Sequence, residues 1–139
     1  MKINVFYILI LCVVISCADK HPKDQIQFID GYWEIKSVEM PDGSIREFTV
    51  NTSIDFIEVN GDSGVRKKLM PRLDGSFKEF PTREKFTFVI RNDSLLMYYQ
   101  TPFANWMETV IEATDSILIV ENKDRKAYVY KRFKKLELE

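Results

Sequence analysis

Cysteine, histidine, glycine and proline are all scarce in this chain of 139 residues, which has 2 Cys, 1 His, 5 Gly and 5 Pro. So little glycine and proline excludes a collagen-like or low-complexity chain. A content of 45% hydrophobic residues excludes a disordered chain. No basic surplus is present, because 20 Lys and Arg face 21 Asp and Glu, so we expect no nucleic-acid partner. One domain is expected at this length.

The few histidines and cysteines also limit the possible chemistry. His21 precedes the folded body, and both cysteines, Cys12 and Cys17, lie near the N-terminus. A hydrolytic triad, a thiol nucleophile or a Cys/His zinc site therefore lacks its residues in the rest of the chain. Two carboxylates two residues apart on one strand lie about 6.6 Å apart, as in a glycosidase pair, but only Glu137 and Glu139 have this spacing. We expect no catalytic residue, cofactor or metal, although an acidic pair across strands stays open.

The longest apolar run, VFYILILCVVI, covers residues 5–15. It is shorter than the ~20 residues that cross a bilayer and has the length of a signal-peptide core. It leads into Val14-Ile15-Ser16-Cys17, which resembles the lipobox of bacterial lipoproteins. The resemblance implies cleavage before Cys17, diacylglycerol on its sulfur, and an acyl chain such as palmitate on its new amine. The alternatives are an ordinary cleaved signal or a cytoplasmic protein with an apolar N-terminus.

The lipobox divides the chain into a signal peptide (1–16), a lipidated tether (17–27), a folded domain (28–135) and a tail (136–139). Two or three acyl chains anchor a protein stably, so we expect the membrane as a partner through Cys17. The expected location is the outer membrane of the cell envelope. Residues 18–19 do not form the acidic run typical of surface export, which favours the periplasmic side. The sequence indicates no particular protein partner.

From Gly31 onward, short β-rich runs alternate with turn sequences, and no stretch keeps a helical period. Asn60-Gly61 is a strong hairpin signal. The polar connections are too short for crossover helices. The chain is therefore expected to be all-β, an antiparallel up-and-down barrel of about eight or nine strands, with a β-sandwich as the alternative. The expected strands, with an irregular stretch at 71–81, are 32–40, 45–50, 54–59, 65–70, 85–91, 94–100, 106–112, 116–121 and 126–133.

Alternation along these strands predicts which side chains face the interior. The predicted inward set is Trp33, Ile35, Ser37, Phe86, Phe88, Ile90, Leu96, Tyr98, Tyr128 and Tyr130. Runs such as 54–59 and 117–120 are apolar on both faces, so alternation does not orient them.

Gly31-x-Trp33 at the start of the first strand is similar to the opening motif of the lipocalins. With the Asp42-Gly43 turn and the aromatic and basic end of the last strand, residues 28–133 resemble small lipocalin-like lipoproteins of Gram-negative cell envelopes. The resemblance implies that Trp33 closes the base of the barrel after a short helical turn over residues 24–30. It also makes Arg132 the candidate for the late arginine that packs over this tryptophan.

Aromatic side chains are the candidate ligand contacts, although they can equally fill a core. The candidates are Trp33, Phe86, Phe88, Tyr98, Trp106, Tyr128 and Tyr130. The leading hypothesis is a lipid-anchored barrel that binds a small hydrophobic molecule. One alternative is a structural or protein-interaction lipoprotein with a filled barrel and no such ligand. Another is an enzyme with carboxylates that meet across strands.

Overall fold

Turn sequences divide residues 20–135, the part of the chain that the computed structural model describes, into one short helix and nine strands. No helix within this part is long and apolar enough to cross a membrane. Cys17, the predicted signal peptide (1–16) and the predicted tail (136–139) lie outside the described residues. The elements are η1 (Pro22–Phe28), β1 (Gly31–Glu39), β2 (Ile45–Glu47), β3 (Ile54–Asn60), β4 (Ser63–Pro71), β5 (Phe77–Arg91), β6 (Ser94–Gln100), β7 (Asn105–Ala113), β8 (Ile117–Asn122) and β9 (Ala127–Arg132).

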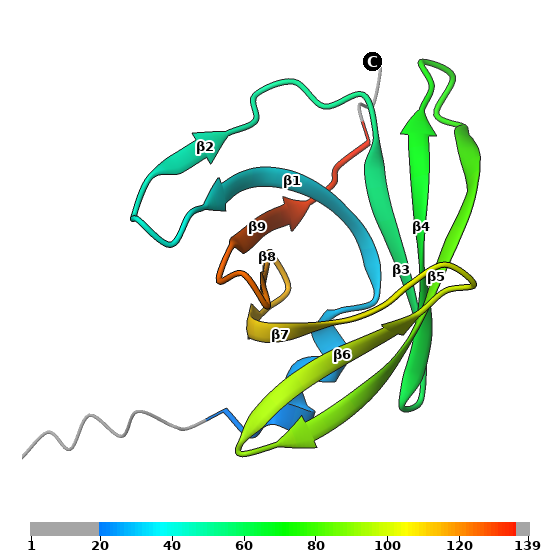
Figure 1. The fold of residues 1–139 in the computed structure, drawn as a ribbon. Helices are drawn as coiled ribbons and strands as arrows, with labels where there is room; N and C mark the ends of the chain where they lie inside the picture. Colours follow the sequence, from blue (N-terminus) through cyan, green and yellow to red (C-terminus); the bar gives the residue numbers. More distant parts are fainter. Residues whose placement is uncertain (1–19, 136–139) are drawn as a thin grey trace, which may run out of the picture.

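Each strand pairs antiparallel with its neighbour in the order β2-β1-β3-β4-β5-β6-β7-β8-β9. A further pairing of β1 with β9 closes the sheet, so β1 and β3 to β9 form an eight-stranded barrel (Figure 1). β2 is an extra strand that pairs with the far end of β1. The expected all-β, up-and-down barrel with a short N-terminal helix is confirmed.

The hairpin between β5 and β6 turns through two residues, Asn92 and Asp93. Both residues have positive φ, 50° and 59°, which the type I′ hairpin turn requires. The turn sets the register Arg91↔Ser94 and Phe88↔Met97.

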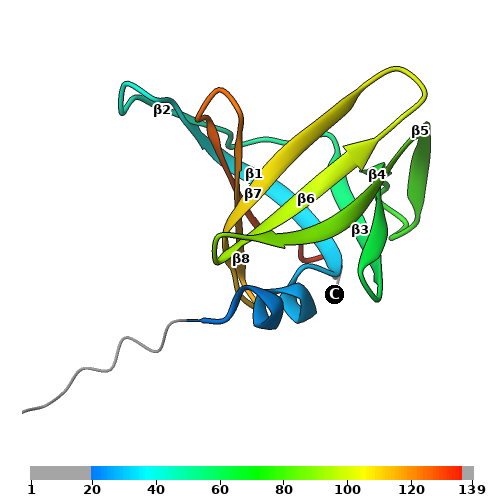
Figure 2. The same cartoon turned by 60° about the horizontal axis from the view of Figure 1, so that its bottom comes forward.

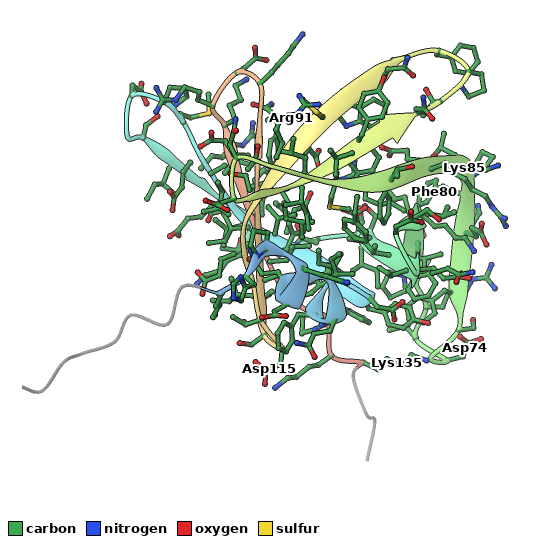
Figure 3. All side chains as sticks on the ribbon, turned by 90° about the horizontal axis from the view of Figure 1, so that it is seen from below. Asp74, Phe80, Lys85, Arg91, Asp115 and Lys135 are labelled. Atoms are coloured by element: carbon green, nitrogen blue, oxygen red, sulfur yellow. The ribbon has the colours of Figure 1, made fainter. Side chains whose placement is uncertain are left out.

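β5 differs most from the expectation, because the irregular stretch predicted at 71–81 contains its first five residues. The strand runs from the turn near Asp74, past Phe80 and Lys85, to Arg91 (Figure 3). Its pairing with β4 breaks between Lys67 and Leu69, opposite residues 80–82. Pro81 lies there and has no N–H to donate. The interruption separates an outer arm, paired only with β4, from the part of β5 that belongs to the barrel.

Apolar side chains from β1, β3 and β5 to β8 fill the interior, together with Ile29 from the segment after η1, and Tyr128 and Tyr130 of β9 pack against them. This buried core consists of Ile29, Trp33, Ile57, Phe86, Phe88, Leu95, Met97, Tyr99, Val110, Ala113, Leu118 and Val120. The predicted inward positions of Trp33, Phe86 and Phe88 are confirmed.

The inward prediction for β6 is wrong by one residue. Met97 and Tyr99 pack in the core, and because successive side chains alternate, Leu96 and Tyr98 lie on the outer face. Residues 95–99 are apolar or aromatic throughout, so alternation alone could not select the phase.

Two further inward predictions need correction. A bulge between Ile35 and Ser37 pairs them with the adjacent residues Tyr130 and Val129, so Ser37 lies on the opposite face from Ile35. Ile90 shares the face of Phe88 but is 51% exposed, because η1 packs mainly against β6 and β7.

One end of the barrel, here called the base, is closed by η1, which lies beneath the strands (Figure 2). The indole N–H of Trp33 donates to the Ile29 carbonyl at 2.8 Å, and the Arg132 guanidinium lies 3.9 Å from the indole ring centre. Arg132 also donates to the backbone carbonyls of Phe28, Asp30 and Asp115. The expectation that Trp33 closes the base under Arg132 is confirmed.

Candidate ligand site at the open end of the barrel

Side chains fill the deep interior of the barrel almost completely. The cavity there measures about 10 Å³, which is room for one water molecule at most. Its lining residues are Trp33, Asp55, Ile57, Arg66, Met97, Tyr99, Glu108, Leu118, Val120 and Tyr130. An apolar ligand would not fit here without rearrangement of the core.

Arg66 is the main polar group in this interior. Its Nη2 lies 2.9 Å from Glu84 Oε2 and its Nη1 lies 3.3 Å from Glu108 Oε2. The guanidinium also lies 4.6 Å from the ring centre of Tyr99, a cation–π distance. One guanidinium therefore joins β4, β5 and β7 across the barrel.

Glu108 is a carboxylate inside a mainly apolar barrel, with only 10% of its side chain exposed. Burial raises the pKa of Glu108, while Arg66 opposes that shift. The sequence left open an acidic pair formed across strands. Glu84 of β5 and Glu108 of β7 are such a pair, since both carboxylates contact Arg66. A sugar has no room between them, because the Arg66 guanidinium contacts both carboxylates and the cavity beside Glu108 holds one water molecule at most.

The opposite end of the barrel, here called the mouth, is hollow. The mouth cavity measures about 360 Å³, within the range of small-molecule sites. Its walls come from β1, β9, the start of β3, Lys68 of β4 and the β2–β3 connection. The lining residues are Ile35, Val38, Phe48, Val50, Asn51, Thr52, Ser53, Ile54, Asp55, Lys68, Tyr128 and Tyr130. The walls combine apolar side chains with about as many polar ones.

The β2–β3 connection is fixed at two points beside the mouth cavity. The backbone N–H of Phe48 donates to the Lys36 carbonyl at 2.9 Å. Asn51 Nδ2 donates to Glu34 Oε1 and to the Ile35 carbonyl, each at 3.0 Å. These bonds hold one wall of the cavity against β1.

Asp55 and Tyr130 line both the mouth cavity and the small interior cavity, so they form the floor between them. Lys68 Nζ lies 3.3 Å from Asp55 Oδ1. Burial raises the pKa of Tyr130, and the nearby charge of Asp55 raises it further. The Tyr130 hydroxyl therefore stays protonated at neutral pH as a neutral donor or acceptor.

A family model described as lipocalin-like domain matches residues 29–120, which is more than half of the chain. This chain belongs to the lipocalin-like domain family. Lipocalin-like proteins are generally non-enzymatic binding proteins, and their barrel typically binds small hydrophobic ligands.

Solved structures with similar folds include a lipocalin-like protein from Bacteroides uniformis, with 13% identity and a TM-score of 0.47. That match covers 75% of this chain and 97% of the other. Apocrustacyanin C1 matches with 10% identity and a TM-score of 0.46 over 86% of this chain and 68% of its own. Lobster apocrustacyanin A1 matches with 10% identity and a TM-score of 0.42, over 78% and 62%. No curated protein matches the sequence.

The seven predicted ligand contacts of this lipocalin-like domain do not come together at one place. Tyr128 and Tyr130 line the mouth cavity. Trp33, Phe86 and Phe88 are buried in the core. Trp106 stacks on Tyr99 with ring centres 4.9 Å apart, and Tyr98 lies on the outer face.

Three charged residues, Asp55, Arg66 and Glu108, lie in the interior, which alternation along the strands does not predict. Charged residues are rarely buried unless they are paired, so they were left outside. A signal for Glu108 did exist, because Trp106, Glu108 and Val110 alternate along β7 and so share one face.

A second hollow, of about 620 Å³, lies outside the barrel between the β4–β5 arm and the C-terminal segment. Phe77 and Phe133 line it, with Arg72, Lys134 and Lys135 among its basic residues. Phe77 stacks on Tyr32 at 5.2 Å between ring centres, so this outer hollow adjoins an external aromatic cluster. It is larger than the mouth cavity but has no buried polar group among its lining residues.

Proposed function

We propose that this lipocalin-like protein is a lipid-anchored binding protein that takes a small, largely apolar molecule at the mouth of its barrel. The observation that carries the proposal is the contrast between the mouth cavity of about 360 Å³ and the filled interior of about 10 Å³. The family supports a binding role. The ligand would contact Ile35, Val38 and Tyr128 rather than the core aromatics.

The anchor belongs to the same proposal. The apolar run at 5–15 and the Val14-Ile15-Ser16-Cys17 sequence support lipidation of Cys17 and attachment to the outer membrane on its periplasmic side.

The filled interior also favours a second candidate function, a protein-interaction lipoprotein without a small ligand. The outer hollow beside Phe77 and Phe133 would then be the contact surface. Crosslinking in cells that recovers a partner through this face, with an empty mouth, would support the second candidate.

Native mass spectrometry of the full-length protein extracted in mild detergent tests the binding function. We expect an extra mass beyond the polypeptide and its anchor that disappears on denaturation. Val38→Trp, which adds bulk inside the mouth, should remove this mass. Met107→Trp, on the outer face beside Tyr98, is the matched control and should keep it. No extra mass, and no uptake from a lipid extract, would contradict the proposal.

A further inference from the structure

The floor of the mouth cavity carries a carboxylate with few partners. Only 12% of the Asp55 side chain is exposed. Within residues 20–135, the partner of the Asp55 carboxylate is Lys68, whose Nζ lies 3.3 Å from Asp55 Oδ1. An ionised carboxylate has about four acceptor sites, and no fully buried side-chain oxygen of the described residues lacks a partner, so the remaining acceptor sites of Asp55 are open to solvent. Asp55 therefore has unused acceptor capacity beside the cavity.

Two sets of ion pairs lie at or near this floor. Asp55, Glu84 and Glu108 are three carboxylates, whereas Arg66 and Lys68 are two cations. Arg66 is shared by Glu84 and Glu108, so it is not available to Asp55. Lys68 is therefore the cation that balances Asp55, and a positively charged ligand group at the floor can take its place.

Lys68 is the group that such a ligand would displace. Half of its side chain is exposed, so its ammonium can move into water at little cost, as is usual for exposed ion pairs. A ligand ammonium would approach through the mouth and bury its attached apolar body against Ile35, Val38 and Phe48. The exchange keeps Asp55 paired and adds apolar contact.

We propose that the mouth site selects amphipathic amines, with Asp55 as the counter-ion of the ligand ammonium and Lys68 as its displaceable substitute. This inference rests on the proposed binding function and names the ligand class of that same site. The apolar walls hold the body of the ligand, and the buried carboxylate discriminates between head groups.

Three naphthyl compounds with the same apolar body test the inference: naphthylethylamine, naphthylethanol and naphthylpropanoate. Binding to the full-length protein in lipid nanodiscs is measured by naphthalene fluorescence anisotropy, with empty nanodiscs as the blank. We expect the amine to bind about tenfold more tightly than the alcohol, since hydrogen bonds to charged groups are the stronger ones. The carboxylate should bind most weakly.

Variants assign the selectivity to the floor. Asp55→Asn should remove the preference for the amine and leave the alcohol affinity within about twofold, since the two side chains are nearly isosteric. Lys68→Met should tighten amine binding, because the competing ammonium is gone. Lys67→Met, one residue away on the outer face beside Glu58, is the matched control and should change nothing. Thermal unfolding of each variant checks the fold.

The outcomes separate the two proposals. An alcohol or carboxylate that binds as tightly as the amine, or an amine preference that survives in Asp55→Asn, overturns the inference and leaves the binding function standing. Failure of all three compounds to bind overturns both. Amine preference that is lost in Asp55→Asn and enhanced in Lys68→Met supports the inference.

Discussion

Arg66 holds two carboxylates inside the barrel, Glu84 at 2.9 Å and Glu108 at 3.3 Å. Removal of one partner of a buried ion pair leaves an uncompensated charge. We expect Arg66→Met to lower the free energy of unfolding by about 3–5 kcal/mol in urea titration. Arg83→Met is the matched control, because Arg83 forms an exposed pair with Glu79, and it should cost at most about 1 kcal/mol. If Arg66→Met and Arg83→Met lowered the free energy of unfolding by the same small amount, Arg66 would not be needed for stability.

The raised pKa of Glu108 predicts that the free energy of unfolding depends on pH. Because burial raises its pKa in the folded state, the contribution of protonated Glu108 to stability is present below its unfolded pKa and is lost as pH rises through the folded value. Glu108→Gln is neutral at every pH. Urea titrations at increasing pH should therefore show the free energy of unfolding of Glu108→Gln rising relative to that of the wild type once the pH exceeds the unfolded pKa of 4.5. If the free energy of unfolding of Glu108→Gln fell relative to that of the wild type as pH rises, the predicted pKa shift would be wrong.

At the residue scale, motifs were predictable and face assignments only partly so. Trp33 and Arg132 are found by position in the lipocalin pattern. Tyr98 was misplaced because its neighbours are apolar on both faces. The two-residue turn determines which residues of β6 face inward. It places Met97 opposite Phe88, and paired residues share a face.

At the element scale, the base depends on the attachment of η1 to the barrel through Arg132. Its guanidinium donates to three carbonyls and covers Trp33. We expect Arg132→Met to cost about 2–4 kcal/mol, because charge-assisted hydrogen bonds are lost and their sum is less than additive. Lys131→Met removes only a half-exposed pair with Glu34 at 3.8 Å and should cost at most about 1 kcal/mol. Similar losses in both variants would show that the base does not depend on Arg132.

Most elements follow from turn chemistry and alternation, and two do not. The arm of β5 contains Pro81 and polar residues, and its only partner is β4. Its pairing is therefore a tertiary contact that local propensity does not encode. β2 is shorter than the expected 45–50 because the chain after Glu47 leaves the sheet to line the mouth.

At the scale of the whole molecule, the proposed anchor depends on one side chain. Cys17→Ser removes the sulfur that would carry diacylglycerol. The protein should then move from the membrane fraction to the soluble fraction, as judged by immunoblotting after fractionation of cells. Cys12→Ser, inside the apolar run, is the control and should leave the distribution unchanged. A Cys17→Ser protein that stays with the membrane would contradict lipidation at this residue.

The barrel architecture was predictable as a whole, but the site was not. Its floor combines Asp55 from β3, Lys68 from β4 and Tyr130 from β9, and only closure of the sheet by β1 and β9 brings these strands together. A cavity of this kind depends on how far the side chains fill the barrel, which alternation does not determine.

The helix that closes the base has a consequence for how a ligand would arrive. With the proposed anchor at Cys17, residues 18–19 alone separate the lipid from Lys20, a span of about 11 Å at full extension. The base of the barrel would then face the bilayer, and the mouth would face the aqueous compartment. The ligand would then enter from the aqueous compartment or from another protein there. It would not enter laterally from the bilayer that holds the lipid anchor.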